Sequence, residues 1–296
     1  MLSSLHVLLT YACTYECDHC FLYCGPQANG TFTRARLEEA IGQGVEAGIS
    51  SIYFEGGEPF LHYPLLLEGL RLSRARGLQI GVVTNGYWAQ SVDDAELWLG
   101  PIAEIGIDEL SISNDRFHAE DPNGSPASFA LEAARKLGLP VGAICIDAPT
   151  PQPASDRSAG GAVIGGDVLF KGRAVDTLLG ELPRRPVELF DECPHEELAT
   201  PTRVHLDPYG NIFVCQGISI GNVWDQPLAR ILADYRPEEH PVVGPLLRGG
   251  PALLASKHDL RVGPTAVDHC HLCFSARRLL LDRFPEHLRP PQVYGR

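Results

Sequence analysis

The stretch Cys13-Thr-Tyr-Glu-Cys17-Asp-His-Cys20 places three thiols in one short segment, directly after the apolar, strand-like run Leu5 to Leu9. The residues ahead of that run show no targeting pattern. Three thiolates can hold three irons of a cubane cluster, which leaves the fourth iron free to bind a small molecule. The same thiols could instead bind zinc or be buried as small apolar side chains. The spacing therefore indicates a site at a strand end and leaves its occupant open.

Two further motifs also follow apolar, strand-like runs. Residues 51–55 lead into Gly56-Gly57-Glu58-Pro59, and residues 81–83 lead into the polar pair Thr84-Asn85. Glycine lets the backbone approach a ligand closely, and a carboxylate such as that of Glu58 can accept from an ammonium group. An acid after two glycines at a strand end is also a poor choice for packing alone. Both motifs therefore indicate ligand contacts at strand ends.

Together the three motifs resemble the radical S-adenosylmethionine (SAM) superfamily, whose cluster motif is CxxxCxxC and whose GGEP segment holds the amino group of SAM. The resemblance implies that Cys13, Cys17 and Cys20 ligate a [4Fe-4S] cluster and that SAM binds at its open iron. The SAM contacts that it implies in the other two motifs are Gly56, Gly57, Glu58, Pro59, Thr84 and Asn85.

The first half of the chain alternates apolar strand-like runs with helical patterns. Such alternation is typical of an α/β fold with parallel strands covered by helices. A sixth strand is expected at Asp167 to Phe170, and the resemblance makes residues 1–180 a partial (β/α)6 TIM-like radical SAM barrel. Its active site should lie at the carboxyl ends of the strands. The expected strands are near 5–10, 50–55, 78–84, 107–113 and 140–146, and the expected helices near 34–47, 61–76, 91–100 and 126–137.

Other polar residues near strand ends are candidates for contacts. His19 stands where the family commonly carries an aromatic residue against the adenine of SAM, and a solvent-facing histidine is the alternative. Ser113 is expected to contact SAM, whereas Asp115 and His118 are expected to face the substrate. Each of these three could equally well cap the loop.

Two basic residues follow the expected sixth strand, and a long loop follows the fifth. Lys171 and Arg173 are expected to reach a carboxylate of SAM or of the substrate, and exposed charges at the barrel rim are the alternative. The stretch Asp147 to Gly161 is rich in proline and glycine and stands where a fifth crossover helix would be expected. It predicts a long loop that acts as a lid or as a wall of the substrate site.

A second set of cysteines lies beyond residue 190, in a region 181–296 that is expected to form a small α+β domain. Residues 204–206 and 212–214, joined by a Pro-Tyr-Gly turn, predict a β-hairpin. This region resembles the twitch domain, a shortened SPASM-type extension, and the resemblance implies one auxiliary [4Fe-4S] cluster. A structural zinc site with four thiolates is the alternative. The expected ligands are Cys193, Cys215, Cys270 and Cys273.

Two cysteines remain. Cys24 follows the cluster motif closely and is either a small buried side chain or a thiol that returns a hydrogen atom to a substrate radical. Cys145 lies in an apolar run and is expected in the core.

The resemblance implies an enzyme that reductively cleaves SAM to a 5′-deoxyadenosyl radical, which abstracts a hydrogen atom from the substrate. Four thiolates around an auxiliary cluster leave no open iron, so we expect that cluster to accept an electron and the enzyme to act as an oxidoreductase. The substrate is expected to be a small molecule or a peptide. One alternative is redox-neutral chemistry such as epimerisation, with Cys24 as hydrogen donor. The other is a non-enzymatic iron–sulfur electron-transfer protein, against which the GGEP segment argues.

The composition of this chain of 296 residues limits the compartments and partners that we expect for it. Nine cysteines without a targeting pattern favour the reducing cytoplasm, where thiols serve metals. A net charge of −13 works against nucleic-acid binding, and no apolar run reaches membrane-spanning length. The expected redox partner is a one-electron reductant such as flavodoxin or ferredoxin.

Overall fold

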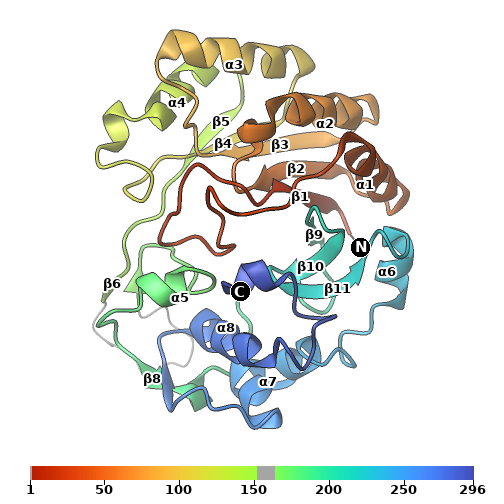
Figure 1. The fold of residues 1–296 in the computed structure, drawn as a ribbon, viewed down its shortest axis with the longest axis vertical. Helices are drawn as coiled ribbons and strands as arrows, with labels where there is room; N and C mark the ends of the chain where they lie inside the picture. Colours follow the sequence, from red (N-terminus) through yellow and green to blue (C-terminus); the bar gives the residue numbers. More distant parts are fainter. Residues whose placement is uncertain (1, 152–163) are drawn as a thin grey trace.

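One sheet of eight strands runs through both halves of the chain (Figure 1). The computed structural model describes residues 2–151 and 164–296. The strand order is β11-β10-β9-β1-β2-β3-β4-β5, and every neighbouring pair from β9 through β1 to β5 is parallel. The strands are β1 (Ser4–Thr10), β2 (Ser51–Gly56), β3 (Gln79–Thr84), β4 (Glu109–Ser113), β5 (Val141–Ile144), β9 (Arg203–Leu206), β10 (Asn211–Cys215) and β11 (Ile218–Asn222).

Helices α1 (Arg34–Glu46), α2 (Tyr63–Ala75), α3 (Val92–Ile105) and α4 (Pro126–Lys136) cover one face of the parallel strands (Figure 1). Thr33, Ser91 and Ser125 cap α1, α3 and α4 by accepting from a backbone N–H of the first turn. Leu5 and Val7 of β1 contribute to the core on this face. The predicted α/β fold, with a parallel sheet like part of a TIM barrel, is confirmed.

The predicted sixth strand at Asp167 to Phe170 is wrong. The chain turns there, with positive φ at Asp167 and Gly172, and Phe170 packs into a small apolar cluster with Leu182 and Val267. The apolar character of this segment therefore serves local packing and not the sheet. The sixth parallel position is taken by β9, which pairs with the other edge of β1.

The predicted hairpin at residues 204–214 is formed by β9 and β10, which pair antiparallel. Asp207 closes the turn, because its Oδ1 accepts from the backbone N–H groups of Tyr209 and Asn211 at 3.0 and 2.9 Å. Gly210 follows with φ +87°. The hairpin thus adds C-terminal residues directly to the N-terminal sheet.

Much of the C-terminal half shares a core with the loop that carries the first cysteines (Figure 1). Leu22 of that loop shares a core with Val214 of β10 and with Phe274 and Leu280 of helix α8 (His269–Leu280). Helix α7 is kinked at Gly249 and Gly250. The remaining elements are β6 (Thr150–Pro151), β7 (Ile164–Gly165), α5 (Ala174–Thr177), β8 (Arg185–Pro186), α6 (Leu228–Asp234), α7 (Val243–Lys257), β12 (Thr265–Ala266) and α8 (His269–Leu280).

Two other predictions, the long loop and the buried Cys145, concern the region that follows β5. Most of the predicted loop from Asp147 to Gly161 lies outside the described residues, and its flanks β6 and β7 pair antiparallel. Cys145 was expected in the core but is exposed, because it follows β5 at the free edge of the sheet. In the part of the chain that the structure describes, no helix is long and apolar enough to cross a bilayer.

Candidate active site

A cavity of about 310 Å³ opens at the carboxyl ends of the parallel strands. Cys13, Cys17 and Cys20 all line it, so the three predicted cluster ligands come together in one place. This edge is where sheets of parallel strands usually bind their ligands. The other predicted site residues that line the cavity are His19, Cys24, Gly56, Gly57, Thr84, Asn85, Ser113 and His118.

The glycine pair lets the turn after β2 lie against the cysteine loop. The backbone N–H of Gly57 donates to Thr10 O at 2.7 Å, and the N–H of Glu58 donates to Ala12 O at 2.8 Å. A Cβ added at Gly57 would come within 2.1 Å of Ala12 O, and Gly56 has φ +137°. Only glycine fits both positions without moving the backbone.

Glu58 and Pro59 lie behind the glycine pair and do not line the cavity. The Glu58 carboxylate is fully buried and accepts from the N–H of Phe60, the hydroxyl of Thr84 and the N–H of Asn85. Burial raises the pKa of Glu58 to about 7, against these hydrogen bonds. The carboxylate thus ties the GGEP turn to the end of β3, and its contact with an ammonium group stays a prediction.

The surroundings of the first three thiols suit a metal–thiolate site. The N–H of Tyr15 and the side-chain amide of Asn85 donate to Cys13 Sγ at 3.5 and 3.6 Å. Burial raises the pKa of Cys13 to about 11 and that of Cys17 to about 12, and neighbouring cysteines add to both shifts. Three thiolates side by side therefore need a cationic group among them, which an iron–sulfur cluster supplies.

His19 and Cys24 lie beside this loop. The His19 ring packs on Phe117 with centroids 4.4 Å apart, and burial lowers its pKa to about 4, so the imidazole is neutral. Its contact with adenine stays a prediction. The Cys24 thiol is 2% exposed, and a hydrogen bond to Cys20 together with burial holds its pKa well above the usual range.

Asp115 orders the loop after β4 and positions His118. Its carboxylate accepts from the N–H groups of Phe117 and Ile146 at 3.0 and 3.1 Å and lies 2.7 Å from His118 Nδ1. Asp115 is 4% exposed and does not line the cavity, whereas His118 does. Of this pair, only His118 is placed to meet a ligand directly.

Lys171 and Arg173 stand outside the cavity lining. Arg173 donates to the backbone carbonyls of Cys17 and Cys24 at 2.9 and 2.7 Å, and its own N–H donates to Cys20 O at 2.8 Å. Lys171 is buried, 3.5 Å from Glu196 Oε1 and 4.0 Å from Cys215 Sγ. Neither is an exposed rim charge, and both engage protein groups.

The four later cysteines also converge. Cys193, Cys215, Cys270 and Cys273 line one small cavity together with Lys171 and Arg277. Arg277 is 1% exposed, and the partners described for its guanidinium are Gln216 O and the Tyr294 hydroxyl, with no carboxylate among the described residues. Burial lowers its pKa, but Tyr294 and three of the cysteines outweigh that effect. Two buried cations beside four thiols fit an anionic metal–thiolate site, either iron–sulfur or zinc.

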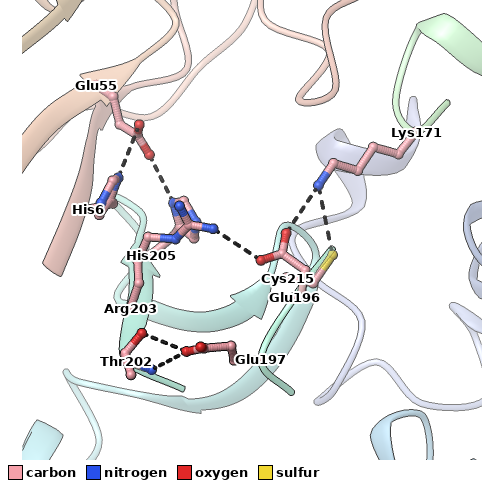
Figure 2. Close-up of polar contacts among 9 residues, drawn as sticks. All are labelled: His6, Glu55, Lys171, Glu196, Glu197, Thr202, Arg203, His205 and Cys215. Carbon is pink, nitrogen blue, oxygen red and sulfur yellow. Dashed lines mark hydrogen bonds and ion pairs between the residues drawn. The ribbon is translucent and has the colours of Figure 1, made fainter. Parts of the chain in front are cut away.

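A polar network that the motifs did not predict lies between the two cysteine sites (Figure 2). Glu55 lines the first cavity and contacts His6 and His205, while Glu196 joins Arg203 to Lys171. The sequence does contain a sign of this network. His6, Glu55 and His205 are polar residues at alternate positions of otherwise apolar strands, so their side chains point to the face of the sheet opposite the helices.

Comparisons with known proteins agree with this geometry. The model of the radical SAM superfamily matches residues 7–153. A putative peptide biosynthesis protein YydG of Bacillus subtilis (strain 168) is 27% identical over 134 residues, 45% of this chain and 42% of that protein. The chain therefore matches less than half the length of this curated relative.

Two solved structures share the fold. A structure of native anSMEcpe with bound AdoMet and Cp18Cys peptide aligns with a TM-score of 0.54 at 15% identity, over 96% of this chain and 97% of that one. BtrN in complex with AdoMet and 2-DOIA aligns with a TM-score of 0.52 at 16% identity, over 79% and 83%. At such identities the likeness concerns the fold alone. With the match over residues 7–153, and with the cysteine motif and the glycine pair of GGEP lining one cavity, the chain belongs to the radical SAM superfamily, whose members use SAM and a [4Fe-4S] cluster.

Proposed function

We propose that this protein is a radical SAM oxidoreductase with two cysteine-ligated metal centres. The observation that carries the proposal is the pairing of two sites: a cavity lined by Cys13, Cys17, Cys20 and the glycines of GGEP, and a second site with four cysteines and two buried cations. When bound, a reduced [4Fe-4S] cluster supplies the electron that cleaves SAM to a 5′-deoxyadenosyl radical, which abstracts a substrate hydrogen atom.

In this scheme the residues of the chain shape the cavity and hold the cluster ligands in place. The glycine pair lets the backbone of the GGEP turn border the cavity, and Asn85 and the Tyr15 N–H donate to Cys13. Arg173 holds the carbonyls of the cysteine loop. We propose that His118, oriented by Asp115, faces the substrate.

The four-cysteine site is proposed as an auxiliary [4Fe-4S] site that takes the second electron of a substrate oxidation. Buried Lys171 and Arg277 support this role, because nearby cations favour the more negative, reduced state of a metal–thiolate centre. A flavodoxin or ferredoxin in the cytoplasm is the proposed electron source.

A peptide or a small molecule is the proposed substrate class. One structural neighbour contains a bound peptide, another contains 2-DOIA, and a sequence relative carries a peptide-biosynthesis name. The cavity of about 310 Å³ has the size of a small-molecule pocket.

A redox-neutral reaction such as epimerisation is the second candidate. Cys24 lines the same cavity as the three cluster cysteines, where its thiol can return a hydrogen atom. Deuterium from solvent would then appear in the product, whereas an oxidation leaves the product without it.

The test compares wild type, the Cys13→Ala/Cys17→Ala/Cys20→Ala variant and Cys270→Ala after anaerobic reconstitution. Wild type should carry about eight irons per chain, twice the four of one cubane. The triple variant should lose about four irons and all 5′-deoxyadenosine formation under dithionite, whereas Cys270→Ala should keep SAM cleavage. Cys145→Ala, at an exposed cysteine, is the control for iron content. Undiminished cleavage by the triple variant would refute the SAM site, and about four irons with one zinc in wild type would refute the auxiliary cluster.

A further inference from the structure

Three polar side chains that belong to neither cysteine set converge on one another (Figure 2). His6 of β1, Glu55 of β2 and His205 of β9 stand on three neighbouring strands. His205 Nδ1 lies 2.9 Å from Glu55 Oε1, and His6 Nδ1 lies 3.4 Å from Glu55 Oε2. One ligand atom from each residue lies within 4.8 Å of the others. We propose that His6, Glu55 and His205 bind a divalent first-row transition metal ion at a third site, which shares no ligand with the two cysteine sites and borders the first of them through Glu55.

The donor set and its spacing match such an ion. Two imidazole nitrogens and one carboxylate form the ligand set of mononuclear sites that keep open positions for a further ligand. Bonds of about 2.0–2.2 Å around a tetrahedral ion separate ligand atoms by about 3.3–3.6 Å. The two nitrogen–oxygen distances of 2.9 and 3.4 Å differ from that separation by less than about half an ångström, which small side-chain rotations supply.

One nitrogen of the cluster lacks a good partner. His6 Nδ1 is buried and has no hydrogen bond among the described residues, and its 3.4 Å contact with Glu55 is long for one. The ring is held in place by stacking on Tyr53, with centroids 4.5 Å apart and planes at 10°. A buried ring nitrogen that points at a carboxylate without a hydrogen bond is costly, and a shared metal ion would satisfy both groups.

The pKa shifts of two of the three side chains, His205 and Glu55, suit metal binding. Burial lowers the pKa of His205, with Glu55 opposing the shift and His6 and Arg203 adding to it. Burial raises the pKa of Glu55, but the hydrogen bond from His205 and the nearby His6 ring outweigh that effect and hold this pKa well below its usual range. Arg203 lies 3.3 Å from Glu196, so its charge has a counterion of its own. A neutral imidazole and a carboxylate are the ligand forms.

The site is enclosed but reachable. The side chains of His6, Glu55 and His205 are 14%, 21% and 11% exposed, and Glu55 lines the cavity of the first three cysteines. An open coordination position next to Glu55 would bind an oxygen or nitrogen donor of the substrate, such as a carboxylate or an amide. That role rests on the proposed function, whereas the metal site itself does not.

Manganese alone is the probe for this site, because Mn²⁺ prefers oxygen and nitrogen ligands and competes poorly for thiolates. It is titrated into anaerobically reconstituted full-length protein, without SAM or reductant, and free Mn²⁺ is measured by electron paramagnetic resonance. Wild type should bind one ion per chain tightly. Glu55→Gln and His205→Ala should each weaken binding by roughly tenfold or more, since each removes a ligand.

The matched control is Glu109→Gln, which alters another carboxylate that contacts Tyr53, at 2.8 Å from its hydroxyl, but lies outside the cluster. It should bind Mn²⁺ as wild type does. Circular dichroism checks folding, and His6→Gln replaces any cluster variant that fails to fold. Absence of tight binding in wild type, or equal binding by all variants, would overturn the site and leave a plain hydrogen-bonded cluster. Failure of SAM cleavage with Mn²⁺ binding intact would instead contradict only the proposed function.

Discussion

At some positions of the cavity the residue type is required because two backbone segments lie very close together, and not because its side chain takes part in the chemistry. Gly57 touches the cysteine loop so closely that a methyl group has no space, because an added Cβ would lie 2.1 Å from Ala12 O. Glu58 acts from behind, where its buried carboxylate accepts from the Thr84 hydroxyl and the Asn85 N–H. The GGEP turn therefore joins three strand ends into one rigid wall.

Gly57→Ala should damage this wall. We expect SAM affinity to fall by roughly tenfold or more, because the added methyl group pushes the turn away from the cysteine loop. Equilibrium dialysis with labelled SAM on the reconstituted protein measures it. Gly42→Ala is the control, since nothing lies within 4 Å of an added Cβ in α1 and the exchange should stabilise the helix by about 0.5–1 kcal/mol. Unchanged SAM binding by Gly57→Ala would show that the close contact is dispensable.

At the scale of elements, the segment Lys171 to Arg173 joins the two cysteine sites. Arg173 holds the carbonyls of Cys17 and Cys24, and Lys171 reaches Cys215 of β10. Gly172 has φ +63°, and an added Cβ would lie 2.4 Å from the Phe21 backbone. The segment Lys171 to Arg173, which follows the wrongly predicted strand, thus holds the cysteine loop in place.

Arg173→Ala should loosen that loop. Hydrogen bonds from a charged group contribute about 1.5–3 kcal/mol, so we expect a lower melting temperature and roughly half the wild-type iron after desalting. Iron analysis and circular dichroism measure the two effects. Arg248→Ala, which removes an exposed ion pair with Glu238, should change neither. If Arg173→Ala retains full iron and stability, these hydrogen bonds have no structural role.

At the scale of the whole molecule, the main sheet of eight strands combines strands from the N-terminal and C-terminal halves of the chain. β9 pairs with β1, the buried Tyr11 hydroxyl donates to Asp207 at 3.0 Å, and Trp224 packs edge-on against Phe32 with centroids 6.2 Å apart. Trp224 also lies under the Arg36 guanidinium. The hairpin of β9 and β10 is therefore part of the N-terminal core.

Unfolding should consequently be a single transition. Trp224→Phe leaves Trp88 and Trp98 as probes of the N-terminal half, so its fluorescence is compared with that of wild type during denaturant unfolding. We expect both proteins to show one transition. The midpoint of the variant should differ from that of wild type by the same amount whether it is measured by circular dichroism or by fluorescence. Two separated transitions would mean that the halves fold independently, as the expected domains 1–180 and 181–296 imply.

The sequence by itself determined the features that depend on neighbouring residues. The cysteine spacing, the GGEP turn, five parallel strands and the hairpin with its Pro-Tyr-Gly turn all follow from local pattern and backbone sterics. Only the tertiary structure decided that β9 lies beside β1, that His6, Glu55 and His205 meet, and that Lys171 and Arg173 bind protein groups. Strand order and the meeting of these side chains depend on which segments, distant in sequence, pack against each other. The local pattern of polar and apolar residues does not determine that packing.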